Sequence, residues 1–197
     1  VGAILTNASP VSLADVTPIA RLTGEAEAIA VPVGSPIQTI GDLVELLKAD
    51  PGAVSWAGGS AGGVDHITVG LLAKAAGVDP TKVNYVAFSG GGEALAAILG
   101  NQVTAGISSV SEFQAQADAG TMRILAVSTA ERWPSTAAPT LKESGLDGDV
   151  LNWRTLAAAP AHFPGIGDLA DDCVAAAADR IVAAEGGPAW DDDGFAR

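Results

Sequence analysis

Three short segments rich in serine and glycine lie where predicted strands lead into predicted helices. They are GGSAGG (Gly58–Gly63), SGGG (Ser89–Gly92) and SSVS (Ser108–Ser111). The first turn of a helix has unpaired backbone N–H groups and a partial positive charge, and residues without bulky side chains let an anion approach them closely. Three kinds of chemistry compete for such a site: phosphate binding, nucleophilic catalysis by serine, and carboxylate binding.

Phosphate binding fails on the spacing of the first segment. A P-loop requires G-x-x-x-x-G-K-[ST], and although Gly58 and Gly63 have this separation, Val64 and Asp65 follow where the lysine and the hydroxyl should be. The dinucleotide-binding pattern G-x-G-x-x-G cannot be placed on these glycines in any register. Both common phosphate-binding motifs are therefore excluded here.

A serine hydrolase is the alternative that the residues leave open. GGSAG (Gly58–Gly62) matches the G-x-S-x-G elbow of α/β-hydrolases, with Ser60 as the nucleophile between a strand and a helix. His162 would be the base, with Asp147 or Asp149 as the acid. However, no HGGG-like oxyanion segment precedes the elbow, and the sequence around His162, AHFPG, indicates only a proline-flanked loop.

Carboxylate binding uses all three segments, and it is the function that we predict. Backbone amides would be joined by the hydroxyls of the segment serines, and His66 would donate a ring N–H from the first turn of its helix. Asp65 would repel a nearby anion, so we expect it to point away or to cap the helix. Arg154 follows Trp153 and is a rare cation in an acidic chain; it fits a ligand contact and a structural ion pair equally well.

Strands and helices alternate along the middle of the chain. Alternation of this kind predicts an α/β fold with a parallel sheet, helices on both faces, and ligands beyond the carboxyl ends of the strands. We place lobe boundaries near Glu25 and near Ser128, so that residues 25–128 form lobe two, and 1–24 with 129–197 form part of lobe one. Predicted strands are Ala28–Val33, Ala53–Trp56, Val83–Phe88, Val103–Ile107, Arg123–Ser128 and Val150–Ala159.

The predicted helices follow from caps and from apolar spacing. Thr39 is a natural N-cap with Asp42 three residues later, before apolar residues at i, i+3, i+4 and i+7. A second helix ends at Gly77 and should bury Val64, Ile67, Leu71, Leu72 and Ala75. Further helices are predicted at Glu93–Gly100, at Glu112–Gly120 and from Asp168 onward.

Composition excludes several other functions. The formal net charge of −13 disfavours binding to nucleic acid or to anionic membranes. No segment reaches the roughly 20 apolar residues of a membrane span. The single cysteine, Cys173, excludes an intrachain disulfide and a cysteine-rich zinc site. No motif for a metal or a cofactor remains, and we expect neither.

The order of several segments resembles the TctC (Bug) family of extracytoplasmic solute receptors, the substrate-binding proteins of tripartite tricarboxylate transporters. The resemblance covers about Asp15 to Pro160, and the DHI, NWR and ERxP details look closest to the tricarboxylate branch. The matching segments are WAGGSAGGVDHI, VNYVAFSGGGEALAAILGNQVTAGISSVSEF, RILAVSTAER, APTLKESGL and NWR.

The resemblance implies a two-lobed periplasmic-binding-protein type II fold and a periplasmic or other extracytoplasmic location. Such a protein clamps a di- or tricarboxylate, citrate-like in this branch, and hands it to the membrane components of the transporter without catalysis. By position it implies three binding loops, formed by Ser60, Ala61, Gly62, Gly63 and His66, by Ser89, Gly90 and Gly91, and by Ser108 and Ser109.

Two parts of the chain depart from the family pattern. Family members begin with an export signal and a glycine-rich unit of lobe one, and nothing before Val1 supplies either. The segment after Pro160 matches poorly. We therefore expect an incomplete first lobe, possible anchoring through the missing signal, and weak ligand binding by the 197-residue chain alone.

Overall fold

The computed structural model describes residues 8–10, 12 and 15–158, and the contacts divide the chain into two units. One contains Glu25–Asn152, and the other contains Pro10–Gly24 with the chain from Trp153 onward. Strands β1 (Thr17–Pro32) and β6 (Leu151–Ala158) pair with each other, and each has residues in both units. In the second unit, the Thr155 hydroxyl donates to the Ala20 carbonyl oxygen at 2.6 Å.

The first unit continues beyond Ser128, near which the sequence predicts a boundary. The Val150 amide donates to the Ser128 carbonyl at 2.9 Å, and the Ser128 hydroxyl donates to the Val150 carbonyl at 2.6 Å. These bonds join the segment before β6 to the end of β5 (Met122–Val127). The assignment of residues to two lobes stays a prediction.

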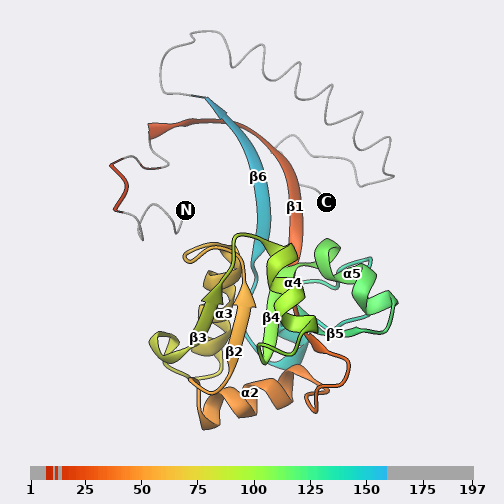
Figure 1. Cartoon of the computed structure of the whole chain (residues 1–197). Coiled ribbons are helices and arrows are strands. Elements are labelled where there is room, and N and C mark those ends of the chain that lie inside the picture. The colour runs from red at the N-terminus through yellow and green to blue at the C-terminus, as the bar shows by residue number, and fades with distance from the viewer. Residues whose placement is uncertain (1–7, 11, 13–14, 159–197) are drawn as a thin grey trace. The chain divides into compact units, whose positions relative to one another are not determined.

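The strands of the first unit form one sheet with the order β3-β2-β4-β1-β5 (Figure 1). Its remaining strands are β2 (Ser55–Gly58), β3 (Asn84–Ala87) and β4 (Ala105–Ser109). β2 pairs in parallel with both β3 and β4. The crossover helices are α3 (Val64–Ala75), α4 (Gly91–Leu99) and α5 (Val110–Asp118). The predicted alternation of strands and helices is confirmed.

β1 runs antiparallel to β4 and to β5, which corrects the prediction of an all-parallel sheet. No single crossover connection joins β1 to β4 or to β5, so neither pairing has to be parallel. In register, Glu27 lies opposite Ser109, the last residue of β4. The start of β1 in this unit therefore lies at the sheet edge where β2, β3 and β4 end.

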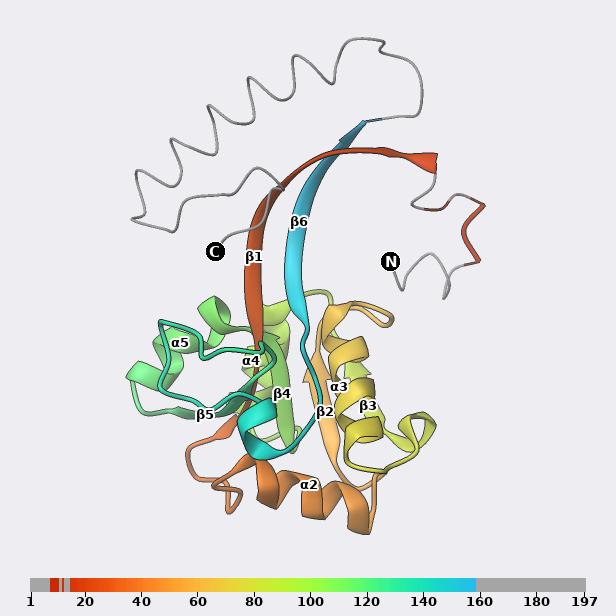
Figure 2. The same ribbon diagram turned by 180° about the vertical axis from the view of Figure 1, so that it is seen from behind.

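Helices cover both faces of the sheet, as predicted. Along β1, Ile29 and Val31 pack in the layer with α2 (Ile40–Ala49) and α3, whereas Ala28 and Ala30 pack in the layer with α4 and α5. Figure 1 shows α4 in front of the sheet and α3 behind it, and Figure 2 shows the reverse. Small residues bring α4 close, since a Cβ on Gly106 would overlap the Ile98 side chain.

α2 begins with the cap that the sequence predicts. The Asp42 amide donates to the Thr39 hydroxyl at 3.2 Å, and the Asp42 carboxylate accepts from the Thr39 amide at 2.9 Å. This reciprocal capping box satisfies two donors of the first turn. The buried residues of α2 are Ile40, Leu43, Val44 and Leu47, at the predicted spacing.

α3 buries a different face from the predicted one. Its side chains Ile67 and Leu71 are 41% and 39% exposed, whereas Asp65 is only 8% exposed. The helix buries Asp65, Thr68, Val69, Leu72 and Ala73 instead. The predicted face was wrong because the helix is turned so that Asp65 reaches the preceding loop, a contact that apolar spacing does not reveal.

β6 confirms the strand predicted near residues 150–159. The predicted helix from Asp168 lies outside the described residues. No helix among the described residues has the length and apolar character needed to cross a membrane.

Candidate carboxylate site

The three serine- and glycine-rich loops lie at one edge of the sheet. They follow β2, β3 and β4, which are neighbours that run in the same direction. Gly58 lies level with Ala87, and Ala57 lies level with Gly106. The structure therefore brings the loops together where parallel strands place a ligand site. Whether these residues bind a ligand stays a prediction.

The first loop, Gly59–Gly63, is held by its own short contacts. The Gly63 amide donates to the Ser60 carbonyl at 2.8 Å, and a Cβ on Gly63 would also come within 2.8 Å of that oxygen. Gly62 has a φ of +75°, a conformation that glycine adopts without strain. Ser60 and Ala61 are exposed at the tip. The glycines thus allow a tight loop that presents Ser60 and Ala61 to solvent.

His66 fixes the far end of this loop. Its Nδ1 accepts a hydrogen bond from the Gly62 amide at 3.1 Å, so this nitrogen is unprotonated in that contact. Its ring stacks on Tyr85, with centroids 4.3 Å apart. The structure thus gives His66 a role in loop geometry, and its Nε2 is the nitrogen that remains as a ligand donor.

Asp65 lies inward beneath the loop, so it points away from the exposed loop tip, and the N-cap of α3 is Gly63. Its Oδ2 accepts from the Gly59 amide at 2.7 Å. Burial is the main cause that raises the pKa of Asp65, and the hydrogen bond from Gly59 acts in the opposite direction. The Tyr85 hydroxyl donates to the Gly59 carbonyl at 2.9 Å, so both backbone groups of Gly59 are held.

Glu112, in the first turn of α5, links the second and third loops. Its carboxylate accepts a short hydrogen bond from the Ser108 hydroxyl. A Cβ on Gly91 would overlap the same carboxylate, so only glycine fits without displacing Glu112. Ser109 is buried, and its hydroxyl accepts from the Asn152 side chain at 3.2 Å. Ser108 and Ser109 are therefore engaged inside the protein rather than open to solvent.

The protein's own carboxylates occupy several amides at this edge. Besides Asp65 on Gly59, Glu93 accepts from the Ser89 amide at 3.1 Å, and Glu25 accepts from the Ser111 amide at 2.9 Å. Sequence reasoning expected free donors at these helix starts. The reason for the difference is that a carboxylate in or near the first turn is the nearest acceptor for such amides.

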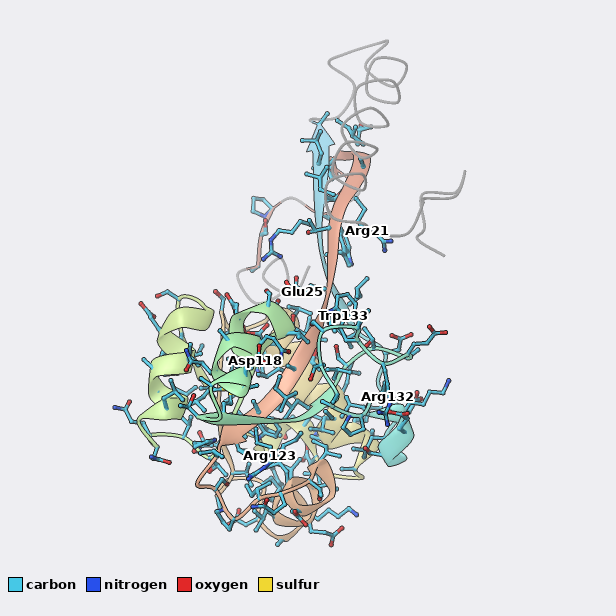
Figure 3. All side chains as sticks on the ribbon, turned by 90° about the vertical axis from the view of Figure 1, so that its right-hand side faces the viewer. Arg21, Glu25, Asp118, Arg123, Arg132 and Trp133 are labelled. Carbon is cyan, nitrogen blue, oxygen red and sulfur yellow. The ribbon has the colours of Figure 1, made fainter. Side chains whose placement is uncertain are left out.

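Other donors at this edge remain open. In the part of the chain that the structure describes, the amides of Ser60, Ala61 and Gly90 donate no hydrogen bond. Glu25 lies at the loop edge, while Arg123 lies at the other end of the sheet (Figure 3). The Arg123 guanidinium is engaged there with the carbonyls of Ile37 and Val33 at 2.9 and 3.2 Å. Arg123 therefore supplies no charge to an anion at the loops.

Arg154 and His162 belong to parts of the chain outside the first unit. Arg154 lies on β6 in the second unit, and its role as a ligand contact stays a prediction. His162, the base in the hydrolase hypothesis, lies outside the described residues. Of its two candidate acids, Asp149 accepts from the Ala130 amide at 3.2 Å.

A groove of about 310 Å³ lies away from the three loops. It is lined by α2, by the end of α3 and by residues 144–146. Its charged side chains, Lys48 and Glu45, pair with each other at 3.0 Å. None of the predicted site residues lines it, and we assign no ligand to it.

Glu27 is the residue of this edge that sequence reasoning missed. It is fully buried in β1, and neither of its carboxyl oxygens accepts a hydrogen bond of normal geometry. Burial is the main cause that raises its pKa to about 8, and the charge of Asp65 is the second cause. A signal existed in the sequence, because Glu27 directly precedes the apolar run of β1.

Comparison with known proteins decides the family. The model of the family described as "Tripartite tricarboxylate transporter family receptor" (TctC) matches residues 5–177. The chain belongs to the TctC family. A curated relative, the UPF0065 protein in the gbd 5'region of Cupriavidus necator, is 30% identical over 137 residues, which cover 67% of this chain and 39% of that protein.

Solved TctC-like structures share the fold of this chain. A TctC solute-binding protein from Polaromonas, solved without ligand, is 26% identical with a TM-score of 0.73, covering 90% of this chain and 60% of that one. MatC from Rhodopseudomonas palustris with bound malate is 24% identical with a TM-score of 0.71, covering 82% and 55%. An R. palustris protein with adipate has the same identity and TM-score, covering 82% and 54%.

The fold is that of the type II periplasmic-binding proteins, as the sequence predicts. At 24% identity the two ligand-bound structures show this shared fold and no more. The chain spans between about two fifths and three fifths of the length of these relatives.

Proposed function

We propose that this TctC family member is an extracytoplasmic solute-binding protein for a small di- or tricarboxylate. The observation that carries the proposal is the cluster of three strand-to-helix loops at one sheet edge, with open amides at Ser60, Ala61 and Gly90. Oriented amides at helix starts bind carboxylates without a cationic side chain. Such a site is compatible with the formal net charge of −13, because the attraction is local.

The family and its relatives support this choice of ligand class. The family description is that of a receptor of tripartite tricarboxylate transporters. Relatives of the same fold hold malate or adipate, which are dicarboxylates. The partners we propose are therefore a small carboxylate and the membrane components of such a transporter, and the location we propose is the periplasm. Within the class of small carboxylates, the more specific ligand that we propose is a citrate-like one.

The proposal includes no catalysis. Ser60 is exposed on its loop, but the nearest histidine in the chain, His66, already accepts the Gly62 amide through Nδ1. A serine hydrolase using Ser60 remains the competing function, because the G-x-S-x-G pattern lies between β2 and α3 as that class requires.

Isothermal titration calorimetry on this chain tests the proposal. Citrate, tricarballylate, malate, succinate and adipate would be titrated at concentrations up to tens of millimolar, each against its neutral amide or methyl ester. Binding of at least one acid but not of its neutral counterpart is the expected result. Equal heats for acid and ester, or turnover of the ester, would contradict it.

A further inference from the structure

Glu27 is a fully buried carboxyl group with no counter-charge. Its exposed fraction is 0%, neither oxygen accepts a hydrogen bond of normal geometry, and the nearby Asn152 side chain offsets only part of the rise in its pKa. In the described part of the chain it forms no ion pair, and no group of side chains there is arranged to hold a metal ion. Leaving a carboxylate ionised and unpaired in the interior is so costly that such a group takes up a proton.

The backbone of Glu27 is held by hydrogen bonds on both of its polar groups. Its amide donates to the Ser128 hydroxyl at 2.9 Å, and its carbonyl accepts from the Ser128 amide at 2.9 Å. In the sheet it pairs with Ser109 of β4. Because both neighbouring strands hold β1 at this residue, the backbone directs the side chain to the buried face of the sheet.

Asp65 is the group that faces Glu27. Its carboxyl is also buried. By strand alternation Glu27 points to the same face as Ile29 and Val31, the face that α3 covers, and each of the two carboxyl groups shifts the pKa of the other there. Their mutual hydrogen bond raises the pKa of Glu27 and lowers the pKa of Asp65. These opposite directions fit Glu27 as the protonated donor and Asp65 as the ionised acceptor.

We infer that Glu27 and Asp65 share one proton, and that this proton positions the amide of Gly59 at the start of the first binding loop. Glu27 donates to Asp65, and Asp65 accepts from Gly59 through Oδ2 at 2.7 Å. The Tyr85 hydroxyl holds the other side of Gly59 at 2.9 Å. Glu27 is thus a positioning residue that acts through Asp65 and touches no ligand.

The other acidic groups that face the pair disfavour its second negative charge. Glu25, from β1, raises the pKa of Glu27, and Glu112, from α5, raises the pKa of Asp65. Tyr85, from β3, is neutral, because burial and the charges of Asp65 and Glu27 raise its pKa. The remaining neighbours are the Asn152 side chain, which lowers the pKa of Glu27, and His66, which stacks on Tyr85.

Losing the proton would therefore place two like charges beneath the loop. Their repulsion acts on Asp65, and through it on the Gly59 amide. The consequence for binding rests on the proposed function. If that function holds, carboxylate binding requires the protonated pair. Affinity should then fall as the pH rises through the titration of Glu27.

Carboxyl NMR on the ligand-free chain tests the shared proton itself. With glutamate and aspartate labelled at the side-chain carboxyl carbon, one glutamate resonance should titrate near pH 8 and be absent from Glu27→Gln. The Gly59 amide resonance should shift with the same midpoint in the unmodified chain and show no such step in Glu27→Gln. A Glu27 resonance that titrates near the ordinary value of about 4.3 would overturn the inference.

Asp65→Asn provides a second variant in case Glu27→Gln does not fold. The asparagine can still accept from Gly59, but it is uncharged, so the midpoint of Glu27 should move to lower pH. An unchanged midpoint in Asp65→Asn would show that the two groups do not share the proton.

Ligand binding provides a separate readout. Between pH 7 and pH 9, affinity for a carboxylate that binds should fall about tenfold in the unmodified chain and stay within about twofold in Glu27→Gln. Equal pH profiles would overturn the positioning role. Failure of every carboxylate to bind would refute the proposed function, and the NMR titration would still decide the shared proton.

Discussion

The imidazole ring of His66 stacks on the phenol ring of Tyr85, with their centroids 4.3 Å apart and their planes inclined by 17°. Each ring also holds one end of the first loop. Tyr85 donates to the Gly59 carbonyl at 2.9 Å, and His66 accepts from the Gly62 amide at 3.1 Å. One aromatic pair, joining β3 to α3, therefore fixes both ends of a loop whose tip is open.

Replacing Tyr85 with phenylalanine should loosen this loop without removing the stacked ring. Tyr85→Phe leaves the Gly59 carbonyl without its donor, so the free energy of unfolding should fall by about 1 kcal/mol. Tyr85→Leu also removes the ring contact and should cost more. Urea unfolding followed by circular dichroism measures both. If Tyr85→Phe unfolds at the same urea concentration as the unmodified chain, the hydroxyl does not hold the loop.

Two adjacent glycines offer a matched test of the link between the second and third loops. A Cβ on Gly91 would overlap the Glu112 carboxylate, whereas a Cβ on Gly90 would meet nothing within 4 Å. Gly91→Ala should therefore displace Glu112 from the Ser108 hydroxyl and shift the amide resonances of both residues. Gly90→Ala should leave those two resonances in place.

The larger variant Gly91→Val extends this test to ligand binding. It should lower carboxylate affinity while the circular dichroism spectrum stays nearly unchanged. Unchanged affinity in Gly91→Val would mean that this glycine serves packing alone.

The sequence reveals local features of this fold better than those that depend on distant contacts. The capping box of Thr39 and Asp42 involves residues three apart, and its prediction is confirmed. The burial of Asp65 depends on how α3 is rotated against the sheet, and apolar spacing predicted the wrong face. Glu27 reaches the loop edge only because β1 inserts antiparallel beside β4, a pairing across about 80 residues that no local pattern contains.

The same division holds for the candidate site. Glycine and serine types predict where the three loops are, since turn geometry is local. Which amides stay open depends on side chains from other elements, as with Glu25 of β1 on the Ser111 amide. The ligand role of the predicted residues stays a prediction.

The stability of this chain should fall as the pH rises from about 4.5 to about 8. In that range Glu27 is ionised in the unfolded chain but still protonated in the folded one, because burial raises its folded pKa to about 8. The unfolded state therefore binds fewer protons, and the contribution of Glu27 decreases by at most about 1.4 kcal/mol per pH unit. Above pH 8 both states are ionised and this contribution levels off.

Glu27→Gln isolates this effect, because glutamine has the same shape and does not titrate. Urea unfolding at several pH values should show the unmodified chain losing stability relative to Glu27→Gln between pH 5 and pH 8. Titrating groups that do not face Glu27 cancel in this difference, whereas Asp65 is part of the effect. A difference that is constant with pH would mean that Glu27 has an ordinary pKa in the folded protein.

Ser60→Ala separates the receptor from the hydrolase. In a receptor the Ser60 hydroxyl is one donor among several, so its loss should weaken carboxylate binding by about 1 kcal/mol, or about fivefold, and leave the fold unchanged. Ser35→Ala is the matched control, since Ser35 lies in the turn after β1, beside residues that Arg123 contacts at the other end of the sheet. Calorimetry with the tightest-binding carboxylate compares the two variants, and equal affinities would remove Ser60 from the site. A receptor has no base that activates Ser60, so a fluorophosphonate probe should leave this serine unlabelled. Covalent labelling that is lost in Ser60→Ala and kept in Ser35→Ala would instead establish an activated nucleophile, and the hydrolase would replace the receptor as the function of this loop.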